Sequence, residues 1–184
     1  APNDEIREKI RENLDSLHHF SERVLDGRIK PPNAKRFSRL LLIGIGGSAL
    51  GPQLLYQALE GIPEKEKFSS GLGTYFIDNT DPEGMDRIFK KVGDSLKETL
   101  VLVISKSGGT VETRNGMLET RNAFKNKNLN FAGQAVAVTG EGSLLAQFAN
   151  TEEWLDVFPM WDWVGGRTSV TSAVGLLPAL LQGI

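Results

Sequence analysis

Cysteine is absent from the sequence, and histidine occurs only twice, as the neighbours His18 and His19. The first absence excludes disulfides, thiolate nucleophiles and cysteine-ligated zinc within these 184 residues. Two imidazoles are too few for a three-histidine zinc site. Both histidines fall in a predicted N-terminal helix, away from every glycine-rich loop, so we interpret them as ordinary helix residues and expect no bound metal.

Long hydrophobic runs are also missing. The longest, at residues 40–45 and 100–104, are far shorter than the ~20 apolar residues that cross a bilayer. The first residues, Ala1-Pro2-Asn3-Asp4-Glu5, lack the basic and then apolar segments of a secretory signal. We therefore predict a cytoplasmic protein without a membrane partner.

Neither sign of charge dominates the chain. It has 21 basic and 23 acidic side chains and a formal net charge of −2. So weak a field gives no electrostatic argument for a nucleic-acid partner. Glycine, in contrast, is abundant, with 20 residues in 184, against a typical share of about 7%.

The hydrophobic pattern predicts an α/β protein. Apolar residues three and four positions apart over residues 4–25 indicate an amphipathic helix, which Lys30-Pro31-Pro32-Asn33 ends. Short apolar strands then alternate with helices. We expect strands at 40–43, 74–77, 100–104, 135–138 and 154–158. We expect helices at 52–60 and 81–92, a third that follows the strand 100–104 and ends near 125, a fourth that follows the strand 135–138 and ends near 149, and a last one from 171 to near 183. Strands that are apolar throughout need cover on both faces.

We therefore predict a doubly wound, flavodoxin-like sheet of five parallel strands with helices on both faces, preceded by the N-terminal helix. The expected division is a helix and linker at residues 1–33 and one domain at residues 34–184. Ligands of such sheets bind beyond the carboxyl ends of the strands, where the strand order reverses. Glycines gather at these predicted strand ends, including Gly46, Gly47, Gly108 and Gly109.

The first of these loops, residues 44–52, joins a strand to a helix and is typical of an anion site. A P-loop is excluded because Pro52 and Gln53 stand where Lys and Ser or Thr are required. A dinucleotide fingerprint fits in part, but Asp78 lies well beyond the ~20 residues at which the ribose ligand is expected. A small phosphorylated ligand held with the Ser48 hydroxyl, or a tight turn without any ligand, also fits the pattern.

The second loop favours the phosphate. Four hydroxyls, two glycines and one lysine occur within nine residues: Ser105, Lys106, Ser107, Gly108, Gly109, Thr110 and Thr113. Neutral donors, helix N-terminal amides and one mobile cation suit a phosphate. Helix capping would need one hydroxyl rather than four.

A third segment places Arg167 directly after Gly165 and Gly166. Its planar fork suits oxyanions, and it stays charged at any working pH. A surface arginine paired with a carboxylate is the alternative for this position.

Together, the three segments resemble the glucose-6-phosphate isomerase family. The resemblance rests on Ile43-Gly44-Ile45-Gly46-Gly47-Ser48-x-Leu50-Gly51-Pro52, on Ser105-Lys106-Ser107-Gly108-x-Thr110-x-Glu112-Thr113, and on Asp162-x-Val164-Gly165-Gly166-Arg167-x-Ser169. It spans about residue 40 to the C-terminus. Gly109 departs from the family pattern, which usually has Thr there, and Thr168 stands in place of the usual aromatic residue.

The resemblance implies a sugar isomerase (SIS) domain that binds a hexose 6-phosphate without a cofactor. Ser48, Ser105, Lys106, Ser107, Thr110 and Thr113 would hold the phosphate, and Arg167 would stabilise an enediol intermediate. The family's glutamate base, histidine and lysine lie in a second domain that these residues do not contain, so the chain alone is expected to be inactive. The resemblance also implies a homodimer of the full-length enzyme. A non-catalytic SIS module that senses a sugar phosphate is the alternative function.

Overall fold

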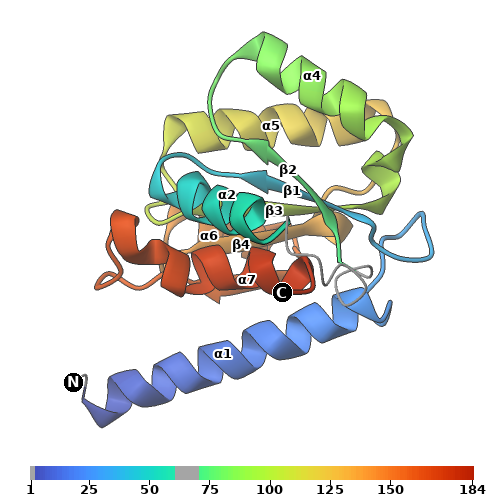
Figure 1. Ribbon diagram of the computed structural model, residues 1–184. Coiled ribbons are helices and arrows are strands. Elements are labelled where there is room, and N and C mark those ends of the chain that lie inside the picture. The colour runs from blue at the N-terminus through green and yellow to red at the C-terminus, as the bar shows by residue number, and fades with distance from the viewer. Residues whose placement is uncertain (1–2, 61–70) are drawn as a thin grey trace.

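A five-stranded parallel sheet forms the centre of the computed structural model, which describes residues 3–60 and 71–184 (Figure 1). The strand order is β2-β1-β3-β4-β5, and every neighbouring pair is parallel. The strands are β1 (Arg39–Ile43), β2 (Gly73–Ile77), β3 (Thr99–Ser105), β4 (Ala135–Thr139) and β5 (Asp156–Pro159). The predicted doubly wound fold is confirmed.

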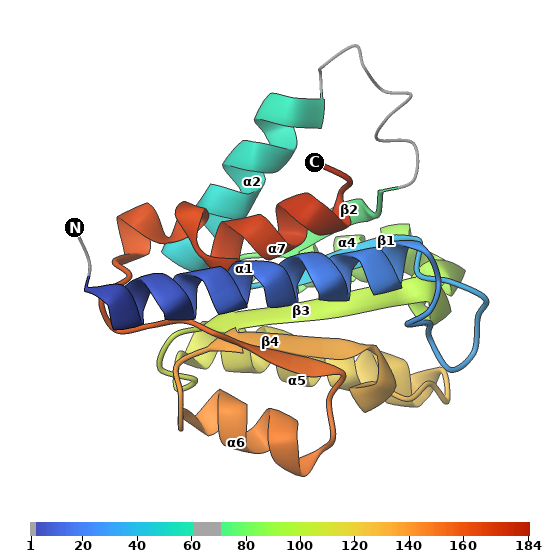
Figure 2. The same ribbon diagram turned by 90° about the horizontal axis from the view of Figure 1, so that it is seen from below.

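Helices cover both faces of the sheet (Figure 2). One face carries α4 (Pro82–Val92), α5 (Val111–Asn126) and α6 (Leu144–Thr151). The other carries α1 (Asp4–Leu25), α2 (Gly47–Glu60) and α7 (Ala173–Leu181). The described residues also form three short 3₁₀ helices: η1 (Gly93–Glu98), η2 (Ala132–Gln134) and η3 (Gly166–Thr171). None of the helices in the described ranges is both long and apolar enough to cross a membrane.

The alternation of side chains along the central strands builds two separate cores. In β1, Leu40 and Leu42 belong to the cluster under α1 and α7, whereas Leu41 and Ile43 belong to the cluster under α4 and α5. All seven residues of β3 are buried. Both faces of the central strands therefore have to be apolar, which is why the sequence shows continuous runs there.

The N-terminal helix α1 has the predicted bounds and is capped by the Asn3 side chain, which accepts from the Ile6 amide at 2.9 Å. Only its second half is buried against the sheet, through Leu17, Phe20 and Val24. Ile10 and Leu14, which continue the same apolar stripe, are 37% and 36% exposed. His18 and His19 are exposed helix residues.

Three elements begin two or more residues away from the predicted position. Helix α2 begins at Gly47 rather than at Pro52, because the Leu50 amide already bonds the Gly46 carbonyl at 2.9 Å, one turn before the proline. Strand β5 begins at Asp156 rather than at Trp154, whose ring packs on Phe131 and Phe148 in the core. Helix α7 begins two residues late, after η3, which the sequence analysis did not predict.

Candidate functional site

The carboxyl ends of β1 and β3 lie next to each other, since Ile43 pairs with Val103 in the parallel ladder. The chain leaves β1 toward α2 on one face and leaves β3 toward α5 on the other. This is the point at which the strand order reverses, so the two glycine-rich loops meet where such sheets bind ligands. Their juxtaposition follows from the strand order.

The loop after β1 packs tightly against the segment that carries Arg167. A Cβ atom added to Gly47 would overlap the carbonyl oxygen of Gly166. The Ser169 hydroxyl closes the contact by donating to the carbonyls of Gly47, at 3.0 Å, and Gly166, at 2.8 Å. Only glycine at position 47 allows this approach. The Ser48 side chain is half-buried in the first turn of α2.

The loop after β3 gathers hydroxyl groups instead. The buried Ser105 hydroxyl donates to the Thr110 hydroxyl at 3.2 Å, and the exposed Ser107 hydroxyl accepts from the Gly109 amide at 3.2 Å. Thr113 lies one turn further along α5. Its Oγ1 is buried and has no hydrogen-bond partner.

Three of these hydroxyl residues share one cavity of about 440 Å³. Ser105, Thr110 and Thr113 line it together with Gly108 and Gly109. Val103 of β3 and side chains of α5 and α6 form the rest of its wall; most of them are apolar, and Arg114 is charged. A cavity of this size with several polar groups in a largely apolar lining has the character of a small-molecule site.

Neighbouring segments hold the second loop in place. The Thr139 hydroxyl, at the end of β4, donates to the Ser105 carbonyl, and the Gly140 amide donates to the Lys106 carbonyl at 2.9 Å. Gly108 has a φ of +68°, and an added Cβ would overlap the Leu145 amide at the start of α6. The sequence analysis missed the role of Thr139. A hydroxyl directly after the apolar run 135–138 is the signal that could have indicated it.

Two cations accompany the loops. The Lys106 ammonium donates to the carbonyls of Asp162, at 2.8 Å, and Val164, at 3.2 Å. Arg167 is exposed, and its side chain makes no ion pair or hydrogen bond with any residue in the described part of the chain. It lines a second cavity, of about 570 Å³, with Gly47, Gly166 and Ser169. Among the described residues, no carboxylate pairs with Arg167 as the alternative for this position requires.

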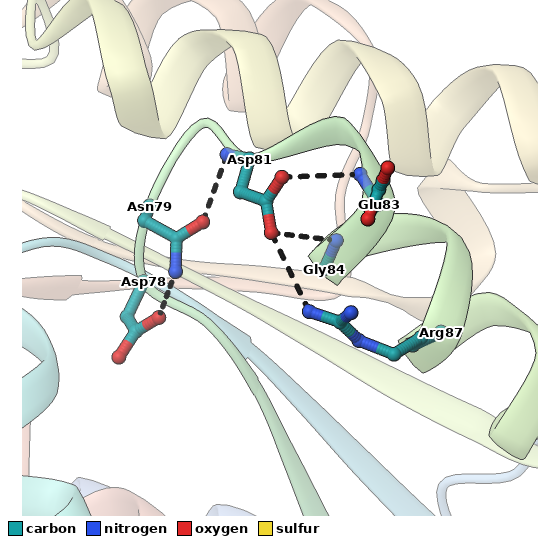
Figure 3. A network of polar contacts seen from close by, with 6 residues as sticks. All are labelled: Asp78, Asn79, Asp81, Glu83, Gly84 and Arg87. Atoms are coloured by element: carbon teal, nitrogen blue, oxygen red, sulfur yellow. Dashed lines mark hydrogen bonds and ion pairs between the residues drawn. The ribbon is translucent and has the colours of Figure 1, made fainter.

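The carboxylates after β2 are already engaged (Figure 3). Asp78 accepts from Gln53 at 2.7 Å and from Asn79 at 2.9 Å. Asp81 caps α4 by accepting from the Gly84 amide at 2.9 Å, and Arg87 pairs with it at 3.5 Å. Asp78 thus braces α2 rather than standing free for a ribose. Within residues 3–60 and 71–184, no group of three His, Asp or Glu side chains could hold a metal ion.

The predicted site residues fall into two groups that line separate cavities. The hydroxyl cavity contains Ser105, Gly108, Gly109, Thr110 and Thr113, and the arginine cavity contains Gly47, Gly166 and Arg167. Ser48, Lys106 and Ser107 belong to the same loops but line neither of these two cavities, and Gly46 precedes the first residue of α2. Sequence analysis assigned no role to Ser169, which joins Gly47 to Gly166 within the arginine group.

The fold and these loops place the chain in the class of doubly wound α/β domains that carry an anion-type site at the switch point of the sheet. The family is more specific. A family model described as phosphoglucose isomerase matches residues 3–184, and the chain belongs to this family.

Individual relatives agree with this assignment. Glucose-6-phosphate isomerases from Geobacter sp. (strain M21) and Citrifermentans bemidjiense are 57% and 58% identical over 184 residues, all of this chain. The crystal structure of a glucose-6-phosphate isomerase from Chlamydia trachomatis is similar with a TM-score of 0.75 and 33% identity; the match covers 92% of this chain and 29% of that one. The chain spans 34% of the length of the two curated relatives.

Proposed function

We propose that this chain is the N-terminal sugar-phosphate-binding portion of an enzyme that interconverts glucose 6-phosphate and fructose 6-phosphate. Residues 34–184 would form its SIS domain and residues 1–33 a helix and linker. The observation that carries the proposal is the buried Thr113 hydroxyl, which lines the same cavity as the Ser105–Thr110 pair and lacks a hydrogen-bond partner. Buried polar groups are nearly always paired, and a phosphate oxygen would satisfy this one.

In this proposal the phosphate is held by the hydroxyls of Ser48, Ser105, Ser107, Thr110 and Thr113 and by the charge of Lys106. The glycines at positions 46, 47, 108 and 166 would allow the backbone to approach the ligand, whereas position 109 has room for a side chain. The amides that open α5 add the positive end of the helix dipole. No cofactor is needed for this binding.

Arg167 would act on the reacting carbons rather than on the phosphate. Its guanidinium has no partner among the described residues and extends from a segment fixed by Gly47 and Ser169, so a negative charge that develops on an enediol would meet a preorganised cation. The proton-transferring base would come from residues of the full-length enzyme outside these 184. We extend the proposal to a homodimeric full-length enzyme in the cytoplasm, as the family resemblance implies.

The experiment has a binding part and a kinetic part. Calorimetric titration should show that fructose 6-phosphate binds residues 1–184 weakly and that fructose does not bind. In a coupled assay that follows glucose 6-phosphate formation, the full-length enzyme should turn over, whereas residues 1–184 should not. Turnover by residues 1–184 at even a hundredth of a typical kcat of ~10 s⁻¹ would place the base within them.

A further inference from the structure

The Lys106 side chain bridges two distant segments of the site. It follows β3, yet its ammonium donates to the carbonyls of Asp162 and Val164, 56 and 58 positions further along the chain. The Asp162 carboxylate lies 3.8 Å from the same nitrogen. With 35% of its side chain exposed, Lys106 is held across the gap between the segments instead of extending into solvent.

The segment that receives these bonds leads directly to Arg167. A turn closes it, with the Val164 amide donating to the Trp161 carbonyl at 3.1 Å, and Gly165 and Gly166 follow. Two successive glycines hold a backbone weakly because they leave its torsions free. In the described part of the chain, Lys106 is the one residue whose side chain bonds to the carbonyls of residues 161–164.

The glycines are therefore fixed from two sides. Before them, Lys106 holds the carbonyls of Asp162 and Val164. After them, Ser169 joins Gly166 to Gly47 in the loop after β1. Each of the two glycine-rich loops thus supplies one anchor for the segment that presents Arg167.

We infer that Lys106 is a positioning residue for Arg167 in the isomerase reaction, and this inference rests on the function proposed above. Two of the three ammonium N–H groups bond to the turn, which leaves the third for an anion in the hydroxyl loop. Lys106 can thus couple the binding of an anion in the phosphate loop to the position of the Arg167 guanidinium. A displacement of about 1 Å at a reacting centre can reduce the rate about a hundredfold.

A double-mutant cycle in the full-length enzyme tests this role. Lys106→Met keeps the length of the side chain and removes the ammonium. In the parent enzyme it should lower kcat for fructose 6-phosphate about tenfold to a hundredfold, with a smaller change in KM. In an Arg167→Ala background the same substitution should change the residual kcat less than about threefold, because the group that it positions is gone. Lys90→Met, on the exposed face of α4, is the matched control.

Equal losses of kcat in both backgrounds would overturn the inference. So would an effect confined to KM and to the affinity for inorganic phosphate, which would make Lys106 a phosphate ligand only. If the parent full-length enzyme shows no isomerase activity, the proposed function fails, and the positioning role is then decided by the spectroscopic measurement below.

The stacked rings of Trp161 and Trp163, 5.0 Å apart and 12° from parallel, lie in the turn that Lys106 holds. Lys106→Met should therefore change the near-ultraviolet circular dichroism of the full-length protein, while Lys90→Met should leave it unchanged. An unchanged spectrum in a folded Lys106→Met variant contradicts the inference.

If Lys106→Met does not fold, Lys106→Arg replaces it. A guanidinium can donate to both carbonyls, so kcat should stay within about tenfold of the parent enzyme. A larger loss in that folded variant, with the turn's spectrum unchanged, contradicts the inference.

Discussion

The loops after β1 and β3 both place glycine and serine behind an apolar strand, but the structure uses them in different ways. In the first loop glycine is needed because it has no side chain: a Cβ atom at position 47 would overlap the Gly166 carbonyl. In the second loop the hydroxyls matter, since Ser105, Thr110 and Thr113 converge on one cavity. A glycine-rich turn at a strand end is therefore not one kind of site. Both loops hold the segment that carries Arg167, but only the loop after β3 also gathers hydroxyl groups at a cavity.

Gly47→Ala should break this comparison most severely. The added methyl group overlaps the Gly166 backbone, so η3 has to move and Arg167 moves with it. We expect kcat of the full-length enzyme to fall about a hundredfold or more, and the free energy of unfolding to fall by about 1–3 kcal/mol. Steady-state kinetics and denaturant unfolding measure the two effects.

The matched control is Gly109→Ala in the other loop, where an added Cβ meets only the Ser107 hydroxyl, at 3.8 Å. This variant should retain both activity and stability. Equal losses in the two variants would mean that the loops do not differ in the way described.

Arg167→Lys tests what the first loop positions. A lysine keeps the charge and loses the planar fork, so kcat should fall about tenfold to a hundredfold with little change in KM. Steady-state kinetics of the full-length variant measure kcat and KM, and the exposed position Arg36→Lys is the control. A pure increase in KM would show that Arg167 binds only the ground-state substrate.

Ser105→Ala and Thr110→Ala test the donors of the second loop. A hydrogen bond to a charged group contributes roughly 1.5–3 kcal/mol, so each variant should bind fructose 6-phosphate about tenfold more weakly or worse, with a small change in stability. Calorimetric titration measures the affinity, and Ser16→Ala on the exposed side of α1 is the control. Unchanged affinity in both variants would remove this loop from the site.

Gly109→Thr should have the smallest effect, and we expect it to strengthen binding of the phosphorylated ligand. The position is exposed and open, so a threonine fits and returns the hydroxyl that the family usually carries there. We expect phosphate-dependent affinity to rise about twofold to threefold, a fraction of one charge-assisted bond. Weaker binding, measured by the same titration, would show that the loop needs the freedom of glycine at this position.

Most of the fold was predictable because the apolar strands are continuous and regularly separated by helices. The boundaries that were missed have local causes. Pro52 is favoured at the start of a helix, yet the Gly46 carbonyl begins α2 a full turn earlier. Trp154 begins the largely apolar stretch 154–158 in the sequence but packs into the core beside Phe131 after the end of α6, so β5 starts later.

Residue types at the site were predictable, and their connections were not. Four hydroxyls in nine residues indicate a phosphate loop without any structure. The bonds from Lys106 to Asp162 and from Ser169 to Gly47 join segments 56 and 122 positions apart. Contacts between segments so far apart in the sequence depend on the order of the strands in the sheet. The periodicity of apolar residues does not encode that order.

The hydrogen bond between Ser169 and Gly47 joins two residues that are synthesised at well-separated times. At about 5–20 residues per second, a ribosome needs roughly 6–24 s to add the 122 positions between these two residues. Both phosphate-type loops are complete before the arginine segment has been made. A nascent chain that ends before residue 169 would contain both glycine-rich loops, but the Gly47 carbonyl would lack its hydrogen bond from Ser169. The segment that carries Arg167 is thus the last of the three to be synthesised.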